Sequence, residues 1–362
     1  VGSEMCIRDR TNPGAMPCDE EFFNLTNGKY GLDAKYLLCN GPFHVSKWTE
    51  KTSVKLAKNN EYNGESSVSP SSVTFYINND DSEVADKMNS VTYDVAFLSS
   101  SQFSSIENKK DLNSVAVQNV TYSFIFNQND NNYRNKNMRL AFCRSCDTSS
   151  LFDSQSDISK ADGIVPPSCK IGGEDYRNGN AAELLSYDET LAKKNFNDAL
   201  LELGSSSVET TILCTEQYEP FVKQMVQKLQ KTLGVKFVST VKVVSESDLE
   251  AAVNDGNYSV AFYPFKAKSS FAGEIIEVFD QNNIFGYESD VLSQKIRNIK
   301  NNSGSLEGER SAVADAENYL VSEAVIMPVF YENSYFVTSK KTSGIYFYSS
   351  ADNVCFINAK KS

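Results

Sequence analysis

The chain has 362 residues, of which 40% are hydrophobic and 23% charged, values typical of a soluble globular protein with room for two domains. Its formal net charge of −12 at pH 7 argues against nucleic acid or an anionic membrane as the main partner, because binding to phosphate groups requires a basic surface. The apolar run over residues 324–330 is much shorter than the roughly 20 residues of a membrane-spanning helix and contains Pro328, so we expect no transmembrane segment.

The first ten residues, Val1 to Arg10, contain neither the apolar core nor the small-residue cleavage site of a signal peptide. Within them, Met5 to Asp9 resembles a translated adapter sequence from DNA library preparation. We therefore treat residues 1–10 as a non-native adapter scar. On this interpretation the native N-terminus, with any secretion signal or lipid anchor, lies upstream of Thr11.

The N-terminal part of the chain predicts mainly extended elements. Gly41-Pro42 predicts a turn, and the residues after it predict a β-hairpin with one apolar face. Further strands are expected over residues 73–78 and 93–98, with a helical turn over 82–88 between them, and then one long strand over 115–127 and a helix over 137–146.

The rest of the chain alternates helices and strands. Helices that end at Gly204 and Gly234 are predicted from apolar residues on one helical face, and a capping box at Ser247 to Glu250 predicts a third. Strands are expected over 208–214, 235–244 and 258–265, and together these elements predict an open parallel α/β unit. Helices over 290–300 and 307–322 and strands over 325–331, 335–339 and 344–348 complete the pattern.

The cysteine pattern and the lack of catalytic motifs both argue against a metal site or an enzyme active site. The Cys143-x-x-Cys146 pair would suit a redox or zinc site, but no second such pair exists and His44 is the only histidine, so we expect no metal site. Pairing of Cys18 with Cys39 stays open. The sequence has no nucleophile elbow, no Walker loop and no dinucleotide-binding glycine motif, which predicts a protein that is not an enzyme and holds no cofactor.

The predicted hairpin reads Gly41-Pro42-Phe43-x-x-x-x-Trp48 … Leu56-x-x-Asn59-x-x-Tyr62. This resembles the Gly-Pro-aromatic-x-x-x-x-Trp … Leu-x-x-Asn-x-x-Tyr signature of the peptide/nickel-type (family 5) extracellular solute-binding proteins of ABC importers. Other segments resemble the family in the same order: Thr92 to Val95, Tyr122 to Asn127, Met138 to Phe142, Gly163 to Pro167, Tyr187 to Gly204 and Ala324 to Tyr331.

The resemblance implies an α/β, two-lobed periplasmic-binding-protein-like (type II) fold. It implies capture of a small solute, in particular a short peptide, outside the cytoplasmic membrane, and delivery to the permease subunits of an ABC transporter. The implied division is the remainder of lobe one over 11–121, an inserted lobe two over 122–333 and a return into lobe one over 334–362. We expect lobe one to be incomplete, with a sheet edge or an apolar face left uncovered.

Seven residues are candidates for the ligand cleft, because they stand near strand ends or near the crossing between lobes: Tyr122, Phe124, Asn127, Tyr263, Phe265, Lys268 and Tyr331. Packing in the core is the favoured alternative for Phe124.

Where peptide-binding members carry an aspartate for the ligand's α-amino group, this chain carries Lys266 and Lys268, which would favour a carboxylate or phosphate. Lysines that merely line a solvated loop are the alternative. The rival function is a surface or sensory interaction protein that keeps the fold without transport.

Overall fold

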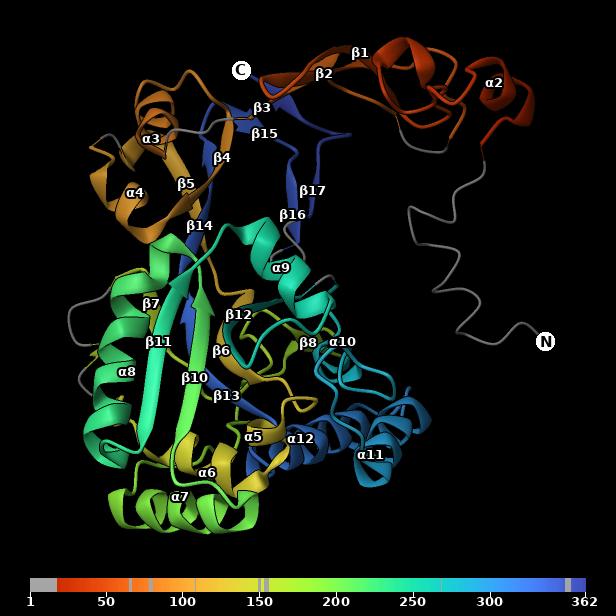
Figure 1. Cartoon of the computed structure of the whole chain (residues 1–362). Coiled ribbons are helices and arrows are strands. Elements are labelled where there is room, and N and C mark those ends of the chain that lie inside the picture. Colours follow the sequence, from red (N-terminus) through yellow and green to blue (C-terminus); the bar gives the residue numbers. More distant parts are fainter. Residues whose placement is uncertain are drawn as a thin grey trace.

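The computed structural model describes residues 18–64, 67–77, 81–107, 109–148, 151–152, 156–267, 269–348 and 353–362. The expected adapter scar and Lys268 lie outside these residues. Two main sheets, one of six strands and one of three, are joined by two short connections, and the N-terminal strands form a third sheet on an arm (Figure 1).

The six-stranded sheet has the order β11-β10-β12-β6-β13-β7. Its strands are Phe237–Val243 (β11), Val208–Cys214 (β10), Val260–Lys266 (β12), Val120–Phe126 (β6), Ile326–Glu332 (β13) and Ile158–Lys160 (β7). β10 runs parallel to both β11 and β12, which confirms the predicted parallel unit. β6 is antiparallel to β12 and to β13, so the sheet as a whole is mixed.

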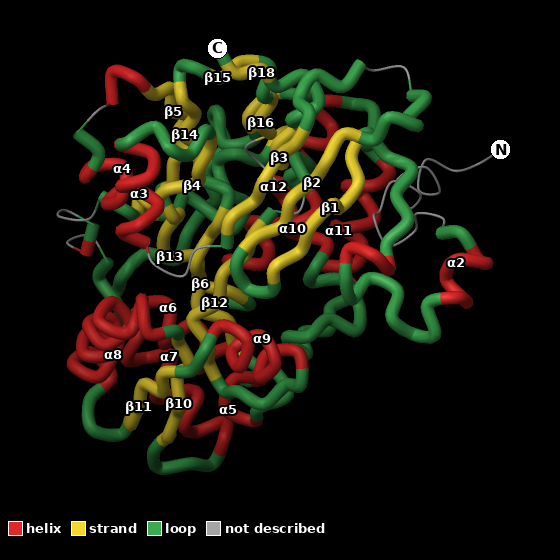
Figure 2. Tube along the Cα trace, turned by 90° about the horizontal axis from the view of Figure 1, so that it is seen from above, coloured by secondary structure: helices red, strands yellow, loops and turns green. Residues whose placement is uncertain are grey.

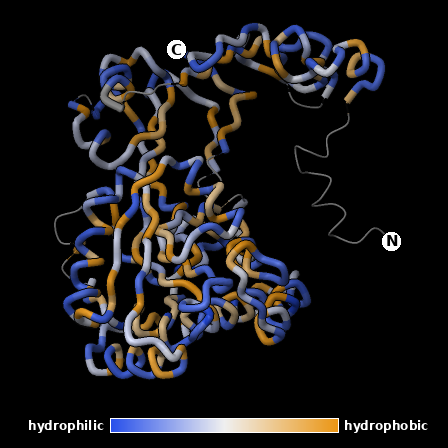
Figure 3. The backbone as a smooth tube through the Cα atoms, viewed as in Figure 1, coloured by the Kyte–Doolittle hydropathy of each residue, from blue (hydrophilic) through white to orange (hydrophobic). Residues whose placement is uncertain are grey.

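Helices cover both faces of this sheet. One face packs against α6 (Lys136–Arg144), α7 (Glu189–Leu203) and α8 (Glu219–Leu233). The other packs against α9 (Glu246–Asn254), α10 (Gly273–Glu277), α11 (Asp290–Asn301) and α12 (Leu306–Ser322). Figure 2 shows α6 to α8 on one side of β6 and β12 and α10 to α12 on the other. Hydrophobic stretches follow the strands between these helix layers (Figure 3).

The helix ends confirm two predictions and correct a third. Gly204 follows α7 in the left-handed conformation with φ 64°, which is a standard helix stop, and Gly234 follows α8 with φ 79°. The third short helix begins earlier than the predicted capping box at Ser247. Its N-cap is Ser245, whose Oγ accepts a hydrogen bond from the Asp248 amide over 3.1 Å, so α9 starts at Glu246.

The three-stranded sheet has the order β4-β14-β5, with β4 Val95–Ser99, β14 Ser334–Ser339 and β5 Leu112–Val117. Its covered face packs under α3 (Asp81–Asn89) and α4 (Ser100–Ser105) around Met88, Leu98 and Val337. Shorter elements include α2 (Glu20–Leu25), α5 (Asn131–Arg134), and the pairs β8 (Lys170–Ile171) with β9 (Glu174–Asp175), β15 (Thr342–Ser343) with β18 (Lys360–Lys361), and β16 (Tyr346–Tyr348) with β17 (Asn353–Cys355). Among the described residues, three short 3-10 helices lie at Ala34–Tyr36, Lys109–Asp111 and Glu216–Tyr218.

The predicted N-terminal hairpin is confirmed. β1 (Phe43–Thr49) pairs antiparallel with β2 (Ser53–Lys58), and β2 pairs with β3 (Ser72–Tyr76). The register places Trp48, Val54 and Phe75 in one row, and Trp48 and Phe75 remain 43% and 44% exposed. The arm therefore presents an apolar sheet face that the described residues bury only in part, through contacts such as that of Phe75 with Phe356.

The expected single strand over 115–127 is wrong. β5 ends at Val117 and β6 begins at Val120, and the two strands belong to different sheets. The chain returns between β13 and β14 at Asn333. The chain thus passes between the two sheets at 118–119 and again at 333. The predicted lobe boundaries at 122 and 334 lie within a few residues of these two connections, and they stay predictions.

Candidate functional site

The parallel strands end together at one edge of the six-stranded sheet. β12 ends at Lys266, which pairs with Val120 at the start of β6, and β10 and β11 run parallel to β12. This edge, formed by the last residues of β10, β11, β12 and β13 and called the carboxyl edge below, lies beside both connections to the three-stranded sheet (Figure 1). Open α/β sheets bind ligands outside the carboxyl ends of their strands, so the carboxyl edge is the candidate binding region.

Tyr122, Tyr218 and Glu332 form a polar cluster at the carboxyl edge. The ring centroids of Tyr122 and Tyr218 lie 4.4 Å apart, and the Tyr218 hydroxyl donates a hydrogen bond to the Glu332 carboxylate over 2.7 Å. Burial raises the pKa of both phenols, and the negative charge of Glu332 raises it further, so both stay neutral at pH 7. A half-buried carboxylate with phenol groups beside it is suited to binding a cationic group.

Sequence reasoning selected Tyr122 but missed Tyr218 and Glu332. Glu332 had a usable signal, because it is the last residue of the strand that carries the predicted Tyr331. Tyr218 had none, since it precedes α8 and meets the cluster only through the packing of that helix against the sheet.

Three of the predicted residues lie on the opposite face of the sheet from Tyr122. Phe265 is 5% exposed and stacks on Phe279 at 5.7 Å between ring centroids. Tyr331 is 3% exposed, and its hydroxyl accepts a hydrogen bond from the Asp162 amide over 3.0 Å. Tyr263 is half-buried, with its ring 5.6 Å from that of Phe265. Of these three, Tyr263 has the most surface to offer a ligand.

The structure places Asn127 at the other end of β6, five residues beyond Tyr122 and therefore about 17 Å away along the strand. Its side-chain amide donates hydrogen bonds to the carbonyl groups of Gly256 and Tyr258, over 2.9 and 2.7 Å. Asn127 lines a polar cavity of about 510 Å³ with Asp130 and other residues there. Asn127 is thus not brought together with the carboxyl-edge residues.

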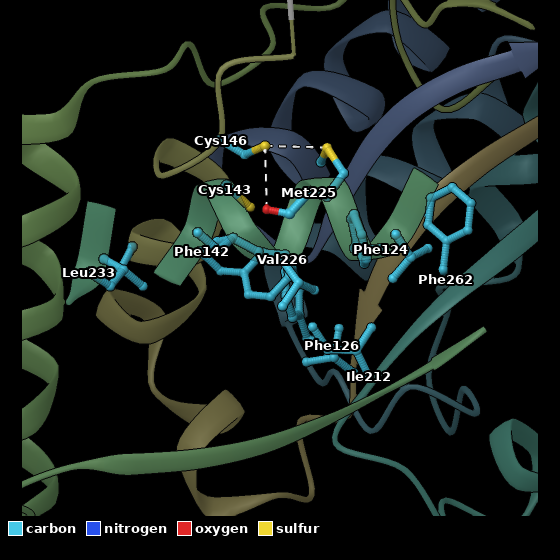
Figure 4. Close-up of a cluster of buried hydrophobic side chains, with 14 of the residues drawn as sticks. Phe124, Phe126, Phe142, Cys143, Cys146, Ile212, Met225, Val226, Leu233 and Phe262 are labelled. Carbon is cyan, nitrogen blue, oxygen red and sulfur yellow. Dashed lines mark hydrogen bonds between the residues drawn. The ribbon is translucent and has the colours of Figure 1, made fainter. Parts of the chain in front are cut away.

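Phe124 lies in the core under the face that α8 covers (Figure 4). It is fully buried, with its ring 5.3 Å from that of Phe142 and 4.9 Å from that of Phe262. This packing supports the sheet beneath Tyr122 and leaves Phe124 no surface for a ligand in this conformation. Lys268 lies outside the described residues, and the neighbouring Lys266 is exposed.

A buried ion pair fastens the loop that follows β7 to α12. Arg177 donates hydrogen bonds through Nη1 and Nη2 to the Glu317 carboxylate, the first over 2.9 Å. Glu317 also accepts from the Tyr176 hydroxyl over 3.1 Å and from the Val165 amide over 3.0 Å. The pair lies beneath Tyr331, whose pKa is raised by burial. This network positions the face of the sheet that carries Tyr331 and Phe265.

The cysteines offer no reactive thiol pair in the part of the chain that the structure describes. All seven described cysteines are free, including Cys18 and Cys39. Burial raises the pKa of Cys143 and of Cys146 to about 12, so both thiols are protonated at neutral pH. Among the described residues, no three His, Cys, Asp or Glu side chains are grouped to hold a metal ion. Over the same residues, no helix combines the length and the hydrophobicity that crossing a membrane requires.

Comparison with known proteins decides the family. The sequence profile described as "Bacterial extracellular solute-binding proteins, family 5 Middle" matches residues 14–284. The chain belongs to this family. The resemblance inferred from the Gly41-Pro42 hairpin and the segments that follow it is thereby confirmed.

Relatives and solved structures agree with this assignment. The dipeptide-binding protein DppE of Bacillus subtilis (strain 168) is 23% identical over 343 residues, which are 92% of this chain and 62% of DppE. The substrate-binding domain of an oligopeptide ABC transporter from Bacillus anthracis superposes with a TM-score of 0.76 at 18% identity, over 97% of this chain and 70% of that one. Listeria monocytogenes OppA bound to peptide gives 0.75 at 20% identity, with the same coverage. The predicted two-lobed α/β fold is confirmed.

Proposed function

We propose that this family 5 chain captures a short peptide between its two lobes, outside the cytoplasmic membrane, and delivers it to the permease of an ABC importer. The observation that carries this proposal is the pair of adjacent connections at 118–119 and 333, placed beside the carboxyl edge. A ligand held at that edge lies where a change in the angle between the lobes would enclose it. The names of the relatives support a peptide as the ligand: one is a dipeptide-binding protein, and another is an OppA bound to peptide.

Within the carboxyl edge we propose that Glu332 binds the cationic amino end of the peptide. Its carboxylate accepts a hydrogen bond from Tyr218, and hydrogen bonds between a carboxylate and an ammonium group are among the strong ones. An acid there would supply the charge that Lys266 and Lys268 do not. Tyr122 and Tyr263, both half-buried, would supply aromatic walls on the two faces of the sheet.

The proposed mechanism is binding without chemistry. Peptide binding would favour the arrangement in which the lobes touch the ligand from both sides, because a ligand shifts an equilibrium only by its difference in affinity for the two states. The permease would recognise that closed arrangement. We propose no catalytic role for any residue.

The test is retention of peptides by the purified chain. The protein is incubated with a tryptic digest of an unrelated protein and passed through a gel-filtration column, and retained peptides are identified by mass spectrometry and then titrated by calorimetry. Replacing Glu332 by Gln is expected to weaken binding about tenfold or more, since a hydrogen bond to a charged group contributes roughly 1.5–3 kcal/mol. Glu209→Gln, an exposed change on β10, is the matched control.

Failure of the wild-type chain to retain any peptide would refute the proposed function. Equal binding by wild type and Glu332→Gln would leave peptide capture standing and would refute the role given to Glu332.

A further inference from the structure

Where the two sheets meet, three strands of one sheet stand end to end with three strands of the other. We call the three resulting pairs columns: β5 with β6, β14 with β13, and β4 with β7. In the three-stranded sheet β14 lies between β4 and β5, and in the six-stranded sheet β13 lies between β7 and β6. The chain joins two of the three columns, because β5 continues into β6 and β13 continues into β14. The third column, in which α4 follows β4 and faces the start of β7, is not joined by the chain. It is joined by hydrogen bonds instead.

Asn333 ties the middle column to its neighbours. Its Oδ1 accepts hydrogen bonds from Gln118 Nε2 over 2.7 Å and from Ser159 Oγ over 3.2 Å. Its Nδ2 donates to the Ser156 carbonyl over 3.0 Å, and its backbone amide donates to the Asp157 carbonyl over 2.7 Å. Gln118 Nε2 also donates to Ser159 Oγ over 2.8 Å. One side chain therefore holds both crossing connections and the residues before β7 together.

Asp157 then links this network to the opposite sheet. Its Oδ1 accepts a hydrogen bond from the backbone amide of Ser101, in the first turn of α4, over 2.5 Å. A carboxylate beside the first turn of a helix is electrostatically favourable. From the same helix, the Ser100 hydroxyl donates to the Asn333 carbonyl in the middle column over 3.3 Å. Asp157 and Ser101 are 56 positions apart in the sequence, so the contact exists only when both sheets are in place.

We propose that Asp157 is a non-covalent third link between the lobes, which confines their relative motion to rotation about the line through the three columns. This inference rests on the proposed function in taking the lobes to move. Neighbouring strands are about 4.8 Å apart, so two adjacent links resist twisting of one lobe against the other only over that distance. A third link in the same row roughly doubles the distance between the outermost links. Rotation about the line leaves the Asp157 to Ser101 distance nearly unchanged. Twisting across it stretches this bond at the end of the row.

The test compares Asp157→Ala with Asp157→Asn, which keeps an Oδ1 acceptor. Nitroxide labels are attached through a ketone-bearing amino acid at Lys110 and Leu201, which are exposed positions on the two lobes, and the distance distribution is measured by pulsed electron resonance on ligand-free protein. Hydrogen exchange of the Ser101 amide is followed by NMR. Asp315→Ala, which removes an exposed acid on α12 far from the connections, is the control.

Asp157→Ala is expected to widen the distance distribution and to speed exchange at Ser101 about tenfold, whereas Asp157→Asn and Asp315→Ala stay near wild type. Wild-type exchange and width in Asp157→Ala would overturn the proposal, and so would equal widening in Asp315→Ala. If the wild type retains no peptide but Asp157→Ala still widens the distribution, the third link stands and the proposed function fails. If the wild type retains peptide and Asp157→Ala changes neither measurement, the proposed function stands and the third link is refuted.

Discussion

Replacing Glu317 by alanine is expected to destabilise lobe two by about 3–5 kcal/mol, which is the usual cost of removing one partner from a buried ion pair. The side chains of Glu317 and Arg177 are 2% and 9% exposed. Without the carboxylate, the guanidinium of Arg177, the Tyr176 hydroxyl and the Val165 amide all lose an acceptor. Burial without a partner is costly for each of these groups, and most costly for the charged one.

The assay is urea unfolding followed by far-ultraviolet circular dichroism. Tryptophan fluorescence would report on the wrong region, because Trp48 is the single tryptophan and lies in β1 on the arm. With a slope near 3 kcal/mol per molar urea, the expected loss lowers the midpoint by roughly 1–2 M. The double variant Arg177→Met with Glu317→Leu is expected to recover most of this loss, since apolar replacement of a buried pair is often neutral or stabilising. A midpoint shift below about 0.3 M for Glu317→Ala would refute the reasoning.

Further predictions concern a close approach and the buried thiols. A Cβ at Gly163 would overlap Arg177 Nη2 and Glu317 Oε1, so Gly163→Ala is expected to cost about 1–3 kcal/mol in the same urea assay, whereas Gly41→Ala, which has open space, should be neutral. At pH 8 a thiol reagent is expected to modify the exposed Cys18 at once and three buried cysteines only after unfolding; labelling of all four in the native protein would contradict the structure. The same burial raises the pKa of these thiols from 9.0 to about 12, so their contribution to the free energy of unfolding is complete below pH 9 and is lost as the pH rises toward 12; a flat stability profile over that window would count against it. These three are Cys143, Cys146 and Cys169, and Cys214 is a fourth buried cysteine.

Elements controlled by local chemistry were predictable from the sequence. Gly204 ends a helix because glycine adopts the left-handed conformation without a steric cost, and this works in any tertiary context. The break at Gln118 and Asn119 was hard to predict, because its one local signal is this pair of polar residues inside an otherwise strand-like run from Val115 to Phe126. Only pairing with two different sheets, made by strands more than half the chain away, divides that run.

The candidate site was predictable in part for the same reason. Aromatic residues near strand ends could be found, but which face each one occupies depends on register. Ser123 pairs with Tyr263, so these two share a face, and Tyr122 points to the other. The cluster of Tyr122 with Tyr218 and Glu332 required the packing of three separate elements.

The central place of β14 has a consequence for the order in which the protein folds. β4 and β5 do not touch without it, and Ser334 in β14 bonds to Val117 across 217 positions of sequence. During synthesis the three-stranded sheet therefore lacks its central strand until all residues between β5 and β14 have been made. Contacts this distant in sequence form slowly and leave strand edges open to other chains. The six-stranded sheet can therefore form first, whereas β4 and β5 gain the strand that lies between them only after β14 has been made.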